Sequence, residues 1–201
     1  MHVFRDIVSE ILIGVDLAIS KNETADYTSI VVVALCYVGD KPVFYVLANS
    51  VNKRMSYPEA IETIKSVAKS HSYGLIPKVV IESNGFQQIY ADTLNNLGID
   101  VEAVKNTSDK RTRIASTSYH VQTGVIVFPE KGAEPLTTQL TGFGIENHDD
   151  LADAFAIAII FGIEQHLSMP DIHIIYHDKT KRPPWYFPGD ENDPVDSDLL
   201  D

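Results

Sequence analysis

The segment Ile11-Leu12-Ile13-Gly14-Val15-Asp16-Leu17-Ala18 is a strand-like run of apolar residues that one acid, Asp16, interrupts. β-Branched and large aliphatic side chains of this kind are typical of strands. A carboxylate is costly in or beside a hydrophobic core unless it is paired or binds a cation. Asp16 therefore needs a functional explanation more than any other residue of this strand.

Two further strand-like runs, 29–38 and 42–51, follow, and Gly39-Asp40-Lys41 between them favours a tight hairpin. The pattern then changes to alternating helices and strands. Helices are expected over 57–70, 86–97, 109–122, 136–140 and 149–166, and strands over 78–82, 101–104, 125–128 and 172–176. Three antiparallel strands followed by this alternation predict an α/β fold, a mixed sheet of five or more strands with helices on both faces.

The chain of 201 residues fits one domain of ordinary size. We expect residues 1–9 to be an N-terminal linker remnant, 10–178 to form the domain, and 179–201 to be a basic-aromatic linker with an acidic, disordered tail. No apolar run approaches the roughly 18 residues that span a bilayer, and no secretory signal is evident. The single cysteine, Cys36, is expected to be a buried apolar residue in a reducing, cytoplasmic setting.

Acids also stand at two other distant places in the chain. Glu82 ends the apolar run Val79-Val80-Ile81, and His148-Asp149-Asp150-Leu151-Ala152-Asp153 places three acids at the start of an apolar helix. Carboxylates from three separate segments predict a shared cation site, and hard oxygen ligands favour magnesium or manganese. Two such ions can neutralise a phosphate, activate a water and stabilise the leaving oxygen in phosphodiester hydrolysis.

In this site Asp16 is the natural bridging ligand, because a central strand holds it rigidly. Glu82 approaches from the strand beside it and Asp150 from the helix. Asp149 and Asp153 are either further metal ligands or residues that support the ligands without contacting the metal. Each acid also has a structural alternative. Asp149 or Asp150 could cap the helix, and Glu82 could end a strand at the surface.

Several other polar residues are candidates for the same site. His148 could orient a water or a phosphate, or be a surface histidine. The best candidates for phosphate contacts form a basic cluster after the strand at 101–104, made up of Lys105, Lys110, Arg111 and Arg113. The alternative explanation of this cluster is a solvated helix face. The net charge of −12 excludes a protein that coats nucleic acid through bulk electrostatics, but not an enzyme that grips phosphates locally.

Taken in order, these motifs resemble the C-terminal nuclease domain of tailed-bacteriophage terminase large subunits, within the RNase H-like nuclease superfamily. The resemblance covers most of residues 10–166. The segments that carry it are Gly14-Val15-Asp16-Leu17-Ala18, Asp26-Tyr27-Thr28-Ser29-Ile30-Val31-Val32, Val80-Ile81-Glu82, Lys110-Arg111 before Gly124, Gln139-Leu140-x-x-Phe143 and His148-Asp149-Asp150-x-x-Asp153-Ala154.

This resemblance implies an RNase H-like fold and a two-metal endonuclease that cuts concatemeric viral double-stranded DNA during genome packaging, with little sequence specificity. Asp16, Glu82 and Asp150 would be its acidic triad, with Asp149 and Asp153 as auxiliary acids and Asp26 as a further metal or water ligand. Many relatives have Asp where this chain has Glu82. The implied setting is the cytoplasm of the infected bacterium, away from membranes, with the packaging ATPase domain, the portal protein and the small terminase subunit as partners. We expect the chain to be a fragment that lacks the preceding ATPase domain, with a stand-alone gene product as the alternative.

Three other functions remain open at this point. A Holliday-junction resolvase would prefer four-way junctions over linear duplex. An actin-like or sugar-kinase ATPase also begins with a strand that carries a Gly-x-Asp motif, but it needs two duplicated domains. A non-catalytic docking module would bind the portal or the small terminase subunit through the acidic tail or the 129–147 loop, without metal-dependent turnover.

Overall fold

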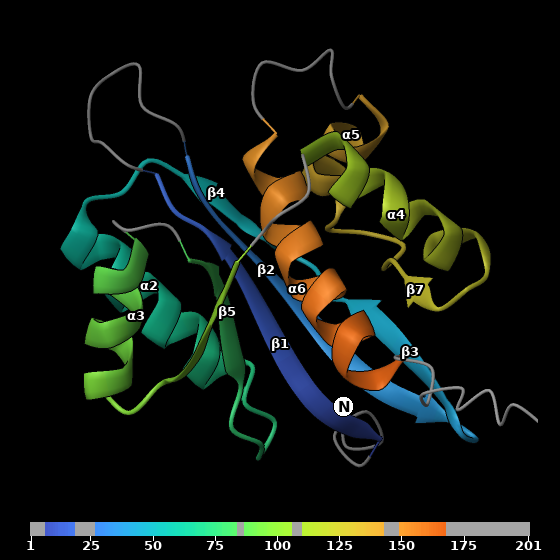
Figure 1. Cartoon of the computed structure of the whole chain (residues 1–201), viewed down its shortest axis with the longest axis horizontal. Coiled ribbons are helices and arrows are strands. Elements are labelled where there is room, and N and C mark those ends of the chain that lie inside the picture. The colour runs from blue at the N-terminus through green and yellow to red at the C-terminus, as the bar shows by residue number, and fades with distance from the viewer. Residues whose placement is uncertain (1–6, 19–26, 84–86, 106–109, 143–148, 168–201) are drawn as a thin grey trace, which may run out of the picture. The chain divides into compact units, whose positions relative to one another are not determined.

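The computed structural model describes residues 7–18, 27–83, 87–105, 110–142 and 149–167. Within these residues a seven-stranded sheet runs in the order β6-β5-β1-β2-β3-β7, with β4 paired to β2 (Figure 1). The strands are β1 (Val8–Asp16), β2 (Thr28–Val38), β3 (Lys41–Val46), β4 (Val51–Lys53), β5 (Lys78–Glu82), β6 (Asp100–Val104) and β7 (Ile126–Val127). The helices are α2 (Tyr57–Ser70), α3 (Gln87–Asn96), α4 (Lys110–Gln122), α5 (Glu134–Thr141) and α6 (Asp150–His166).

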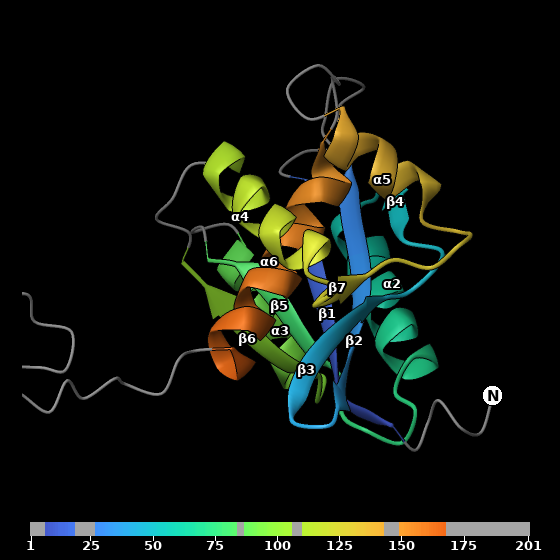
Figure 2. The same ribbon diagram turned by 90° about the vertical axis from the view of Figure 1, so that its right-hand side faces the viewer.

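The directions of the strands confirm the predicted mixed sheet. β1, β2 and β3 form an antiparallel meander, whereas β5 is parallel to β1, β6 to β5 and β7 to β3. Helices cover both faces: Figure 2 shows α2 on one side of the central strands and α6 and α4 on the other. Because β5 is parallel to the neighbouring β1, the carboxyl ends of these two strands lie together at one end of the sheet.

The third strand differs from its expected range of 42–51. The sheet is interrupted after Val46, Asn49 adopts a positive φ of 65°, and the chain resumes as β4, which pairs back onto β2. The backbone N–H of Asn49 donates to the carbonyl oxygen of Gly132 at 2.8 Å. A loop distant in the sequence therefore stabilises the backbone where the strand is interrupted. At the other end, β1 begins at Val8, inside the segment expected to be linker. The expected strand at 172–176 lies outside the described residues.

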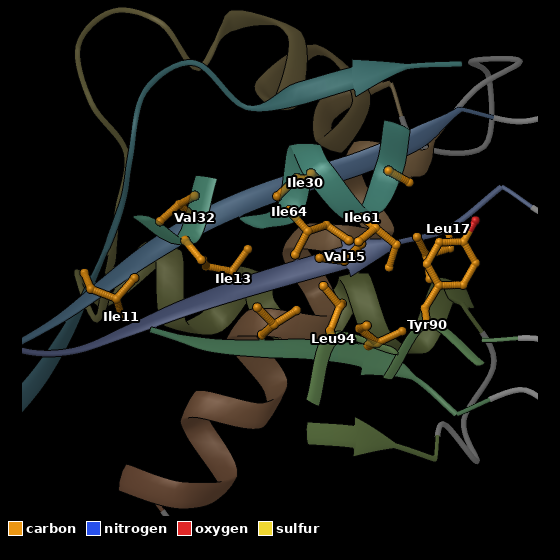
Figure 3. Close-up of a cluster of buried hydrophobic side chains, with 14 of the residues drawn as sticks. Ile11, Ile13, Val15, Leu17, Ile30, Val32, Ile61, Ile64, Tyr90 and Leu94 are labelled. Atoms are coloured by element: carbon orange, nitrogen blue, oxygen red, sulfur yellow. The ribbon is translucent and has the colours of Figure 1, made fainter. Parts of the chain in front are cut away.

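Alternation along β1 divides the core between the two faces of the sheet. Ile11, Ile13 and Val15 pack with Ile64 of α2 and Leu94 of α3 (Figure 3). The opposite face contains the other half of the core, where α5 and α6 cover the sheet. Its fully buried members include Leu12, Val31, Val33, Leu35, Phe44, Leu136, Leu151 and Phe155.

Two glycines allow α6 to lie unusually close to the sheet. A Cβ on Gly14 would stand 2.0 Å from the carbonyl oxygen of Ala154, and a Cβ on Gly162 would stand 2.5 Å from Cε1 of Phe44. Because α6 runs antiparallel to β1, its first turn reaches the carboxyl end of that strand. The close packing thereby fixes the start of α6 above Asp16.

The far end of α6 has its own attachment to the sheet. Nε2 of His166 lies 2.7 Å from Oε2 of Glu10 on β1, and its Nδ1 lies 3.1 Å from the hydroxyl of Tyr37 on β2. A histidine in the last turn also suits the negative end of the helix dipole. Within the described part of the chain, no helix is both long and apolar enough to cross a membrane.

Candidate functional site

Asp16 and Glu82 lie side by side at the ends of two parallel strands. In the register of β1 and β5, Gly14 pairs with Val80 and Val15 with Ile81, so the next residue of each strand is an acid. Val15 and Ile81 point into the core beneath α2 and α3. Since side chains alternate along a strand, both acids point to the opposite face, toward α6.

The ionisation of Asp16 shows that acids from all three segments lie close together. Burial, together with the negative charges of Asp153, Asp150 and Glu82, raises the pKa of Asp16 from 3.8 to about 8, against a smaller opposing effect of Lys110. Asp150, Asp153 and Glu82 therefore lie close enough for their charges to act on Asp16. Without a cation, the Asp16 carboxyl is mostly protonated at pH 7.

The side chain that caps α6 comes from another helix. Oε1 of Gln139 on α5 accepts hydrogen bonds from the backbone N–H groups of Leu151 at 2.8 Å and Ala152 at 3.2 Å. Asp149 occupies the N-cap position but makes no side-chain capping hydrogen bond. The capping alternative for Asp149 is therefore wrong, because Gln139 supplies the side-chain acceptor at this helix end.

Two basic residues of α4 reach into the acid cluster. The ammonium of Lys110 donates to both Asp149 and Asp153, and Nη2 of Arg113 lies 3.3 Å from Oδ1 of Asp153. Burial on its own would lower the pKa of Lys110, but these hydrogen bonds to carboxylates raise it, so the ammonium stays charged. The pKa of Asp153 is raised, chiefly by burial and also by the charge of Asp149, although Lys110 and Arg113 act to lower it.

These contacts divide the predicted phosphate-binding cluster into two kinds of residue. The side chain of Arg113 is only 10% exposed and that of Lys110 is 37% exposed, and both are engaged with acids. Lys105, directly after β6, and Arg111, on α4, are exposed to solvent. Lys105 and Arg111 are thus the two exposed members of the predicted cluster.

The donors at this site suit a divalent metal ion, although they do not yet form a closed set of ligands. Among the residues that the structure describes, no three His, Cys, Asp or Glu side chains form a group that could hold a metal ion as they stand. Carboxylate oxygens are nevertheless the ligands that magnesium and manganese prefer, and burial together with the neighbouring acids raises the pKa of Asp16, which a bound cation would lower. Asp26 and His148 lie outside the described residues, and their roles remain predictions.

Two polar residues near the acids, Ser29 and Asn52, were not among the predicted site residues. Ser29 on β2 stands opposite Asp16, Asn52 on β4 stands opposite Ser29, and the Ser29 hydroxyl donates to Oδ1 of Asn52 at 2.9 Å. In the sequence Ser29 only opens the apolar run of β2; its full burial beside Asp16 depends on the pairing of β2 with β1 and β4. Gln139 was recognised as part of a motif, but its capping contact depends on the packing of α5 against α6.

The mixed sheet, the helices on its two faces and the acids at the ends of β1 and β5 and the start of α6 define an RNase H-like domain. More narrowly, the chain belongs to the terminase RNase H-like domain family, whose model matches residues 13–160. No curated protein sequence matched the chain.

Solved structures show the same fold. Similar chains include crystal structures of the large terminase nuclease from thermophilic phage G20c. The zinc-bound structure has a TM-score of 0.55 at 18% identity and covers 75% of this chain and 80% of its own. The magnesium-bound structure has a TM-score of 0.53 at 17% identity, covering 74% and 79%. The cobalt-bound structure has a TM-score of 0.55 at 16% identity, covering 74% and 79%.

Proposed function

We propose that this chain is a metal-dependent endonuclease domain of a phage terminase large subunit, which cuts concatemeric double-stranded DNA during genome packaging. The observation that carries the proposal is the convergence of Asp16, Glu82 and Asp150 from three distant segments onto one face of the sheet. Family membership and the likeness in fold to phage terminase nucleases support it.

In the proposed mechanism, each acid contributes according to the element that carries it. Asp16, held by a central strand, would hold the ions together with Glu82 on the neighbouring strand and Asp150 at the start of α6. Two divalent ions at this site would supply charge neutralisation on the phosphate, an activated water and stabilisation of the leaving oxygen. Asp149 and Asp153 are proposed as auxiliary acids, with Asp26 as a further ligand and His148 orienting a water or a phosphate.

Magnesium or manganese is the proposed cofactor, because all the described candidate ligands are carboxylates. The G20c nuclease structures contain zinc, magnesium or cobalt, which supports a site that accepts divalent ions. Glu82 has a longer side chain than an aspartate, so it would hold a metal ion farther from its strand than an aspartate would.

DNA would be held by local contacts, since the chain as a whole carries a net charge of −12. Lys105 and Arg111 are the proposed phosphate contacts, and Lys110 and Arg113 can contribute only by leaving acids that they now contact. The proposed partners are the packaging ATPase domain, the portal protein and the small terminase subunit, in the cytoplasm of the infected bacterium.

Cleavage of supercoiled plasmid in Mg²⁺ or Mn²⁺ tests this function. We expect nicking and linearisation that EDTA abolishes and that falls about 100-fold or more in Asp16→Asn, Glu82→Gln and Asp150→Asn, the scale of losing a group that stabilises transition-state charge. Asp40→Asn, in the exposed β2–β3 turn, is the matched control and should cleave normally.

The outcomes separate the alternatives. Metal-dependent cleavage that survives both Asp16→Asn and Asp150→Asn would contradict the proposed site. A strong preference for four-way junctions over linear duplex would assign the chain to the resolvases instead. Binding of portal or small terminase protein without any turnover would indicate a docking module.

A further inference from the structure

Lys110 has an unusual position for a basic residue at the start of a helix. It is the first residue of α4, yet its ammonium lies between Asp149 and Asp153 of another helix and donates to both. Its charge also acts on Asp16 at the end of β1. One lysine therefore interacts with acids from two of the three segments that form the site.

The balance of charge explains why a cation is held there. Asp149 and Asp153 lie one turn apart on the same helical face, where two like charges repel each other unless a cation lies between them. Lys110 supplies that cation, and Arg113 supports Asp153 from the other side at 3.3 Å. The acids of the site can therefore stay together in a folded protein without metal.

The two basic residues differ in how easily they can leave. The Arg113 side chain is 10% exposed, whereas the Lys110 side chain is 37% exposed. A lysine is a compact charge on a flexible stem, and a side chain that is 37% exposed can turn its ammonium to water with little rearrangement around it. Arg113 is thus a fixed part of the cluster, and Lys110 is a replaceable one.

We propose that the Lys110 ammonium occupies the place of a divalent cation against Asp149 and Asp153, and that it leaves these carboxylates when a second metal ion binds. This inference rests on the proposed metal-dependent nuclease function. It makes Lys110 a positioning residue, which keeps the acids assembled in the metal-free protein and competes with the second ion. The released ammonium would then stand beside the site, where it can meet a DNA phosphate.

Chemical footprinting of the wild-type protein tests the release directly. Acetylation of lysine amines with an N-hydroxysuccinimide ester, read by mass spectrometry, is compared in EDTA and in saturating Mn²⁺ without DNA. We expect Lys110 to react slowly in EDTA and several times faster in Mn²⁺, while Lys69, exposed on α2 beneath the opposite face, reacts equally in both. A Lys110 rate that is unchanged or lower in Mn²⁺ would overturn the proposal.

A calorimetric titration with Mn²⁺ provides the second test. Lys110→Met is expected to bind the second ion about tenfold more tightly than the wild type, equivalent to about 1.4 kcal/mol of lost competition. Lys69→Met is the control and should match the wild type. An unchanged or weaker second site in Lys110→Met would mean that the lysine does not compete with metal.

The two hypotheses fail in different ways. If the wild-type protein bound no Mn²⁺ at all, the proposed function would fail and the role of Lys110 with it. If Mn²⁺ bound and Lys110 stayed protected from acetylation, only the inference about Lys110 would be overturned. Should Lys110→Met not fold, the footprint on the wild-type protein decides.

Discussion

Replacing Asp16 by asparagine is expected to stabilise the metal-free protein, increasingly so as the pH rises. In the folded protein, burial and the neighbouring acids raise the pKa of Asp16 to about 8, whereas an unfolded chain has the ordinary value of 3.8. Between these two values the folded state holds a proton that the unfolded state has released. Wild-type stability therefore falls as the pH rises through this window and levels off above about pH 8. Asparagine is nearly the same shape as a protonated aspartate but does not ionise, so it does not cause this loss of stability as the pH rises.

The structure sets an upper limit to the effect. Each tenfold change in proton affinity corresponds to about 1.4 kcal/mol, so a rise in pKa from 3.8 to about 8 limits the gain to about 6 kcal/mol. Relaxation of the cluster and entry of water reduce this figure. We expect Asp16→Asn to be more stable than the wild type by about 3 kcal/mol at pH 8.5, and by close to zero near pH 4.

Urea unfolding in EDTA, followed by circular dichroism at pH values from 4.5 to 9, measures this difference. Asp40→Asn, in an exposed turn, should follow the wild type at every pH. Saturating Mn²⁺ should reverse the order, because only the wild type keeps the full set of ligands. A difference in unfolding free energy that is the same at pH 5 and pH 8.5, or a wild type that is the more stable protein at pH 8.5 in EDTA, would refute the reasoning.

Three substitutions test the elements that position the acids. Gly14→Ala should destabilise the fold by about 3 kcal/mol and reduce cleavage. A Cβ at this position would stand 2.0 Å from the carbonyl oxygen of Ala154 and push α6 away from the sheet. An unchanged melting temperature would contradict this. Gln139→Leu should cost about 1–2 kcal/mol and lower cleavage, since the N–H groups at the start of α6 lose their acceptor; unchanged stability in urea would argue against the cap. His166→Leu should cost about 1 kcal/mol in the same assay but leave plasmid cleavage unaltered, because its contacts with Glu10 lie at the far end of α6; a loss of cleavage would give that end a role in catalysis.

Local sequence patterns predicted most of the elements because each carries its own periodicity. The helix at 57–70 and the strand at 78–82 were predicted at their observed bounds, and the mixed sheet followed from the order of the elements. The convergence of Asp16, Glu82 and Asp150 could also be predicted, because strand ends and helix starts meet at one edge of such a sheet.

What the sequence could not show depended on contacts between distant segments. The run at 42–51 stays apolar through Leu47 and Ala48, and the prediction passed over Asn49-Ser50, a pair of turn-forming residues in the middle of the run. Asn49 adopts the positive φ at the break, where its N–H donates to Gly132. Basic residues at the start of a helix look like phosphate contacts, and only the packing of α4 on α6 directs Lys110 into the acids.

The central claim is that Asp16, Glu82 and Asp150 together bind catalytic divalent ions. A crystal soaked in Mn²⁺ and measured at the manganese absorption edge tests it most directly. The account predicts anomalous peaks between these three carboxylates, with Asp16 contacting both ions and the Lys110 ammonium displaced from Asp149 and Asp153. Fully bound Mn²⁺ elsewhere on the protein, with no peak at Asp16, would contradict it.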